Sequence, residues 1–157
     1  MKADVEFLFV GDGAEGPALR KAAQEMKNVR FIGARPRSDL SSIFSASDIC
    51  IAMLRPDPLF TTVVPTKLYE YMAAGKAIIS NVPGEAASLL EQADAGITIP
   101  PGDPSALAST VIELADDPLR RQAQGLNGAR WVRTNANWAE RAEKYVSIFD
   151  RVVYAGP

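Results

Sequence analysis

The chain has 157 residues, 47% of them hydrophobic and 23% charged, with a formal charge of −2. This composition predicts one globular domain, gives no electrostatic reason to expect nucleic acid, and contains no apolar run long enough to span a bilayer. The absence of histidine excludes Ser-His and Cys-His nucleophile pairs, and the single cysteine, Cys50, cannot build a thiolate cage, so we expect no metal site.

Strands and helices are predicted to alternate along the first hundred residues. Short apolar runs predict strands at 6–10, 29–32, 48–54, 77–80 and 96–99. Residues at helical spacing predict helices at 19–26, 39–46, 65–74 and 87–93. This alternation predicts an α/β fold, a Rossmann-like doubly wound parallel sheet with flanking helices.

The remainder of the chain is predicted to be helical, with helices opening at Pro104 and Pro118 and a last one over 137–155. The last helix is strongly amphipathic. Its apolar stripe, at helical spacing, is interpreted as core and comprises Trp138, Ala142, Tyr145, Phe149 and Val152. Cys50 lies in an apolar strand and is interpreted as a plain core thiol.

Ligands of doubly wound sheets bind at the carboxyl ends of the strands. Gly11-Asp12-Gly13 follows the first predicted strand and begins a G-x-G-x-x-G pattern over residues 11–16. The glycines either allow a tight turn or hold a dinucleotide. Arg35, after the second strand, would suit the 2′-phosphate of NADP, so an NADP-binding oxidoreductase domain is an alternative.

The segment 65–76 gives the most specific chemical signal. Pro65 suits the start of a helix and Gly75 suits the residue just past its end. Lys67 and Glu70 are three residues apart and therefore share a face near the helix start, where free N–H groups and the helix dipole favour an anion. The alternative is an exposed helical ion pair contributing only about 0.3–0.5 kcal/mol.

Four segments, in order and at these distances, carry a family resemblance: 7–13, 29–33, 65–76 and 96–104. On them the chain resembles the C-terminal, nucleotide-sugar-binding half of the GT-B glycosyltransferases, in particular the retaining family 4, or group 1. The resemblance covers nearly the whole chain. It implies that residues 1–157 are a single donor-binding domain whose first strand is missing.

The resemblance also assigns site residues. Glu70 would accept hydrogen bonds from the donor ribose, and the backbone around Ala34 and Arg35 would meet the base. Gly11, Asp12 and Gly13 would line the cleft. The helix start would hold the diphosphate, with these candidates: Thr62, Val63, Val64, Pro65, Thr66 and Lys67. Thr62 stands where relatives have a first glutamate, so what that glutamate does to the sugar is not carried over.

The implied partner is a nucleoside-diphosphate sugar such as a UDP-sugar, with no cofactor. The acceptor would be a glycan or lipid-linked molecule, as in polysaccharide biosynthesis, bound by an N-terminal domain that these residues do not supply. We therefore expect this chain alone to be inactive in sugar transfer. Without a signal-peptide pattern we expect a cytoplasmic protein, and the resemblance adds peripheral association with the inner membrane face.

Overall fold

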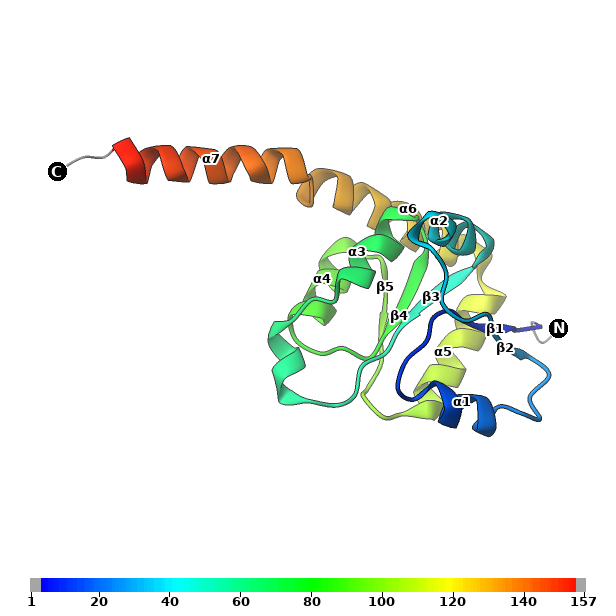
Figure 1. Cartoon of the computed structure of the whole chain (residues 1–157). Helices are drawn as coiled ribbons and strands as arrows, with labels where there is room; N and C mark the ends of the chain where they lie inside the picture. Colours follow the sequence, from blue (N-terminus) through cyan, green and yellow to red (C-terminus); the bar gives the residue numbers. More distant parts are fainter. Residues whose placement is uncertain (1–3, 155–157) are drawn as a thin grey trace.

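The computed structural model describes residues 4–154, and it confirms the predicted α/β fold of parallel strands with flanking helices (Figure 1). The elements, in chain order, are β1 (Phe7–Phe9), α1 (Gly16–Ala22), β2 (Val29–Phe31), α2 (Arg37–Ala46), β3 (Ile49–Ala52), the 3₁₀ helix η1 (Pro58–Thr62), α3 (Thr66–Ala73), β4 (Ala77–Ser80), α4 (Glu85–Ala93), β5 (Gly96–Thr98), α5 (Pro104–Asp116), α6 (Pro118–Asn135) and α7 (Trp138–Tyr154). No helix within residues 4–154 is both long enough and apolar enough to cross a membrane.

The strands form two parallel ladders. β1 pairs with β2, and β3, β4 and β5 pair in that order. Phe7 N donates to Asn28 O, and Phe9 O accepts from Ile32 N, so β1 uses these alternate residues to bond β2. Leu8 and Val10 therefore direct their backbone groups to the opposite edge. In the described part of the chain, no strand pairs with that edge of β1 or with the corresponding edge of β3.

The core is built on both faces of β4, whose residues are all buried. Side chains alternate between the faces of a strand, and here Ile78 packs with Leu68 and Met72 of α3, whereas Ile79 packs with Leu114 of α5. The buried apolar faces of α3 and α5 thus hold these two helices against the same strand.

Helix α3 follows the prediction closely. It begins at Thr66, one position after the predicted first helical residue, with Pro65 as its N-cap, and Gly75 lies just past the end with φ +68°. Leu68 and Met72 are buried, whereas Lys67 and Glu70 remain partly exposed on the side away from β4. The helix is therefore fixed by its apolar face and leaves its polar face open.

Two predictions about apolar residues are wrong. Helix α1 ends at Ala22, short of the predicted end at residue 26, and Leu19 and Met26, which the helical spacing placed on one face, are exposed. The core interpretation of the last helix also fails, because Tyr145, Phe149 and Val152 are exposed on α7. Figure 1 shows α7 extending away from the α/β body. Its periodic pattern indicates an apolar face but not what covers it, and the side chain of Trp138 is outside the described residues.

Cys50 is a buried free thiol in β3, as predicted. Burial raises its pKa from 9.0 to about 11, partly opposed by the Lys76 ammonium. Burial also raises the pKa of Tyr71 from 10.0 to about 12, and the charges of Cys50 and Glu70 add to that shift. Both groups sit beside the β3 and α3 core.

We expect the free energy of unfolding to fall in alkali through these two groups. The unfolded chain releases their protons from pH 9.0 upward, whereas the folded protein keeps them to about pH 11 and 12. Their contribution is therefore complete below pH 9.0 and is lost as the pH rises through this window. In urea unfolding across this pH window, the free energy of unfolding should fall less steeply with pH for Cys50→Ala and for Tyr71→Phe than for wild type. Wild-type slopes in both variants would contradict the assignment.

Candidate functional site

The loops that follow β1, β2 and β3 are joined to one another and to α3 by polar contacts. Gly11 N donates to Gly33 O at 2.8 Å. Arg55, after β3, pairs with Glu15, after β1. Arg37, at the start of α2, lies 3.7 Å from Glu70 of α3. These contacts bring together, at the carboxyl ends of the strands, segments that are far apart in the sequence.

The predicted glycine loop contacts the predicted base-binding segment. Asp12 accepts a hydrogen bond from Ala34 N at 3.1 Å, and the Arg20 guanidinium lies 3.7 Å from the same carboxylate. Gly11 and Gly33 have φ of +121° and +69°, in the region that favours glycine. Gly13, Ala34 and Arg35 are exposed. The glycines therefore serve the turns that bring Asp12 against Ala34, and they leave this surface open.

The start of α3 offers N–H groups that are not capped by a side chain. Its N-cap is Pro65, no side chain accepts from the first turn, and that turn holds no acidic residue. By contrast, Asp103 accepts from Ala106 N at the start of α5, and Asp117 accepts from Arg120 N at the start of α6. The first N–H groups of α3 are thus available to an outside acceptor.

Lys67 lies in that first turn. The side chain is partly buried, and within the part of the chain that the structure describes it makes no hydrogen bond or ion pair. Thr66, beside it, is exposed and presents its hydroxyl at the same helix start. A cation, a hydroxyl and free backbone N–H groups are therefore adjacent, which is the chemistry of an anion site.

Glu70 pairs with Arg37 and not with Lys67, so the alternative of a Lys67–Glu70 ion pair is not what the structure contains. The Arg37 side chain is 90% exposed and that of Glu70 is 41% exposed. Such a pair contributes at most about 1 kcal/mol and is easily exchanged for another partner. Glu70 is consequently an accessible acceptor one turn along from Lys67.

Thr62, Val63 and Val64 link η1 to α3. Thr62 and Val63 are exposed and Val64 is partly buried. The Thr62 hydroxyl donates to Leu59 O at 3.3 Å, a bond local to η1. Thr62 therefore lies at the end of η1, shortly before the start of α3, and its side chain bonds within η1.

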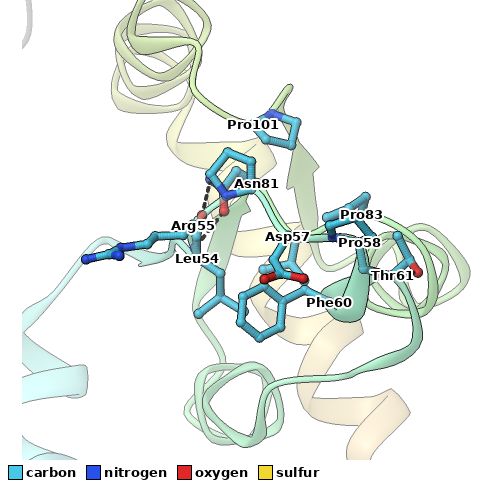
Figure 2. Close-up of a pocket in the computed structure, with 11 residues that line it drawn as sticks. Leu54, Arg55, Asp57, Pro58, Phe60, Thr61, Asn81, Pro83 and Pro101 are labelled. Carbon is cyan, nitrogen blue, oxygen red and sulfur yellow. Dashed lines mark hydrogen bonds between the residues drawn. The ribbon is translucent and has the colours of Figure 1, made fainter.

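Beside η1 lies a cavity of about 280 Å³ at the carboxyl ends of β3 and β4 (Figure 2). Its walls include Phe60, Pro83 and Pro101, and its polar side chains are already bonded within the protein, for example Asp57 to Leu59 N. Asn81 also lines it and bonds Leu54. Asn81 and Arg37 were not singled out from the sequence. For Asn81 the available signal was a polar residue directly after a predicted buried strand.

The family described as "Glycosyl transferases group 1" matches residues 1–117. A GDP-mannose-dependent monoacylated alpha-(1-6)-phosphatidylinositol monomannoside mannosyltransferase of Corynebacterium glutamicum is 29% identical over 150 residues, which are 94% of this chain and 39% of that protein. A phosphatidyl-myo-inositol mannosyltransferase of Mycobacterium leprae is 26% identical over 98% of this chain and 40% of its own length. The chain thus spans about two fifths of these curated relatives.

Solved structures agree on the fold. A sucrose-phosphate synthase from Thermosynechococcus elongatus superposes with a TM-score of 0.79 at 24% identity, over 95% of this chain and 39% of that one. Anabaena Alr3699/HepE, solved in complex with UDP and glucose, gives a TM-score of 0.76 at 19% identity, over 93% of this chain and 40% of that one. At these identities the similarity establishes the α/β architecture of this chain.

Proposed function

The chain belongs to the group 1 glycosyltransferases, and from that premise we propose that it is the donor-binding half of a retaining enzyme. The enzyme would transfer a sugar from a nucleoside-diphosphate donor to a glycan or lipid-linked acceptor. The observation that carries this proposal is the uncapped start of α3, where Lys67 has no partner among the described residues.

The donor diphosphate binds at the start of α3. The free N–H groups of Val63, Val64, Thr66 and Lys67, the Thr66 hydroxyl and the Lys67 ammonium would all direct positive charge at its oxygens. As the bond between the sugar and the diphosphate breaks, negative charge grows on the leaving diphosphate. Groups held in place before the reaction stabilise that charge without further reorganisation, which lowers the barrier. Lys67 is the residue that supplies a full charge.

The nucleoside lies between α3 and the loop after β2. Glu70 accepts hydrogen bonds from the ribose hydroxyls, for which its exposed pair with Arg37 must loosen. The base meets the backbone at Ala34 and Arg35, and Gly11, Asp12 and Gly13 line the adjoining wall. The contact between Asp12 and Ala34 N supports this arrangement, because it fixes the base-binding backbone against the glycine loop.

The same contact weighs against NADP binding. In a dinucleotide-binding fold the glycine loop receives a pyrophosphate. Here the Asp12 carboxylate stands in that loop, and its negative charge would repel phosphate oxygens. Helix α1, which would offer its N-terminus to the pyrophosphate, is only 7 residues long.

Titration calorimetry with UDP, GDP, ADP and NADPH tests the proposal. UDP and GDP are included because HepE was solved with UDP and the Corynebacterium relative is described as GDP-mannose-dependent. We expect one nucleoside diphosphate to bind best. The Arg35→Ala variant should bind that nucleotide with an affinity within about threefold of wild type, since only backbone atoms meet the base. If NADPH binds best and Arg35→Ala abolishes that binding, the oxidoreductase alternative is correct.

The acceptor is bound by another domain of the enzyme. Three observations support this: the coverage of about two fifths of the curated relatives, the edges of β1 and β3 that no strand pairs with within residues 4–154, where a further parallel strand would complete one sheet, and the exposed apolar residues of α7, such as Tyr145, Phe149 and Val152. We propose that α7 packs on that domain and that the first strand of the sheet is supplied by the same enzyme.

We therefore predict that the 157-residue chain by itself transfers no sugar. With the donor held but no acceptor oriented at the sugar, the advantage of placing both reactants together is lost. The measurement is release of nucleoside diphosphate from a radiolabelled donor in the presence of glycan and lipid-linked acceptors. Robust turnover by this chain, removed by Lys67→Ala, would refute the prediction while leaving the donor site intact.

A further inference from the structure

Just past the end of β4, the side-chain amide of Asn81 makes the hydrogen bonds that the backbone of a neighbouring strand would make. It is buried, with 4% of its surface exposed. Its Oδ1 accepts a hydrogen bond from Leu54 N at 2.8 Å, and its Nδ2 donates to Leu54 O at 2.9 Å. Figure 2 draws these bonds as dashed lines. The Asn81 backbone N also donates to Ala52 O at 3.3 Å, so the amide continues the contact of β4 with β3 beyond the last paired residue.

Gly84 holds the other end of the same loop. It is the N-cap of α4 with φ +69° and ψ −129°, and its Cα lies directly against the backbone of η1. A Cβ at this position would be 1.9 Å from Thr61 O and 2.7 Å from Thr61 C. Both contacts are with backbone atoms, which cannot move aside as a flexible side chain can. The position therefore requires glycine for space as well as for conformation.

The segment 55–64 is thus in contact with the connection between β4 and α4 at two places, one before it and one near its end. Leu54, directly before the segment, is bonded to Asn81, and Thr61 lies against Gly84, one residue before Thr62 and five residues before Thr66, where α3 begins. In between, the segment has local bonds, such as Asp57 capping η1, and an exposed ion pair from Arg55. Phe60 and Val64 of the segment also pack, partly buried, against the core around Leu68. The contacts of Asn81 with Leu54 and of Gly84 with Thr61 add two fixed points for its backbone.

We propose that Asn81 and Gly84 are positioning residues for the donor diphosphate, acting through the segment 55–64 on the backbone that precedes α3. The inference rests on the proposed function, because it takes the start of α3 as the diphosphate site. Neither residue touches the donor. Their effect is to fix where the N–H groups of Val63 and Val64 lie before the donor arrives, so that binding does not have to order the segment.

The first test is Asn81→Ala. It leaves both backbone groups of Leu54 without their partners, and we expect the affinity for the preferred nucleoside diphosphate to fall roughly tenfold. Hydrogen exchange of residues 55–64 should become faster. The affinity is measured by calorimetry at a temperature where circular dichroism shows the variant folded, so that a change in melting temperature alone does not enter the result.

Asn81→Asp gives a sharper test because it can be switched. The ionised carboxylate accepts from Leu54 N but repels Leu54 O, whereas the protonated carboxyl accepts from one and donates to the other, as asparagine does. Burial raises the pKa of such a carboxyl. Relative to wild type at the same pH, the affinity of Asn81→Asp should be roughly tenfold lower near pH 8 and should recover toward the wild-type value near pH 5.

Asn28→Asp is the matched control, since Asn28 is exposed at the amino end of β2, away from the site. It should bind like wild type at both pH values. If both Asn81 variants melt earlier yet bind the nucleotide with wild-type affinity at every pH, the positioning role is overturned and Asn81 is a stability residue. If the wild-type chain binds no nucleotide, the proposed function itself is wrong. That result differs from loss of the positioning role alone, in which the wild type and both variants bind equally well.

Discussion

Replacing Lys67 with alanine is expected to weaken nucleoside-diphosphate binding by about ten- to a hundredfold, as measured by titration calorimetry. Hydrogen bonds to a charged group contribute about 1.5–3 kcal/mol, which corresponds to that range. Lys67 has no partner to release within the described residues, so the whole of its interaction is available to the ligand. For the same reason the variant should keep its stability to within about 0.5 kcal/mol.

Glu70→Ala separates the two halves of the ligand. Lys67→Ala should weaken inorganic pyrophosphate and the nucleoside diphosphate alike, because it acts on phosphate. Glu70→Ala should weaken the nucleotide and leave pyrophosphate unchanged, because it acts on ribose. Two exposed residues away from the site serve as charge-matched controls, Lys27→Ala before β2 and Glu91→Ala near the end of α4. Equal losses for Lys67→Ala and Lys27→Ala would show that only net charge matters, and would remove the site from α3.

Gly125→Ala should produce a large loss of stability, about 3 kcal/mol or more in the free energy of unfolding. A Cβ at residue 125 of α6 would lie 2.1 Å from Gly75 O and 2.7 Å from Gly75 C, in the turn that follows α3. Relief requires α6 to move off α3, and Gly128, one turn on, already has Met72 within 3.3 Å of its own Cβ position. The substitution therefore disturbs the packing that holds α3 against β4.

Urea unfolding of Gly125→Ala tests this prediction, with Gly13→Ala as the control variant. Nothing lies within 4 Å of a Cβ at Gly13, so that substitution should be close to neutral in the absence of ligand. A Gly125→Ala protein as stable as Gly13→Ala would mean that α6 does not pack on the turn after α3 as described.

The sequence predicts well where one element satisfies one strong local pattern. The β-branched run 77–80 is a strand with every residue buried, and helix α3 is flanked by the predicted proline and glycine, Pro65 and Gly75. The prediction fails where the pattern of apolar residues does not identify the surface against which they pack. Leu19 and Tyr145 have helical periodicity, yet both are exposed, because amphipathicity requires a partner surface without identifying one.

The residues that hold the candidate site together were not predicted, because their contacts are tertiary. Asn81 bonds Leu54 across 27 positions, and Gly84 meets Thr61 through backbone space alone. Arg37 reaches Glu70 from a different helix. No local rule relates such pairs. By contrast, Lys67 and Glu70 are three residues apart on one helix, so their shared face could be read from spacing.

The central claim is that the donor diphosphate binds at the start of α3 with the nucleoside toward the loop after β2. Hydrogen–deuterium exchange of the wild-type chain, with and without its preferred nucleoside diphosphate, tests it most directly. The account predicts slower exchange at the amides of residues 63–70 and 34–35, with the protection at 63–70 lost in Lys67→Ala. Protection confined to the glycine loop, residues 11–16, with none at the start of α3, would contradict it.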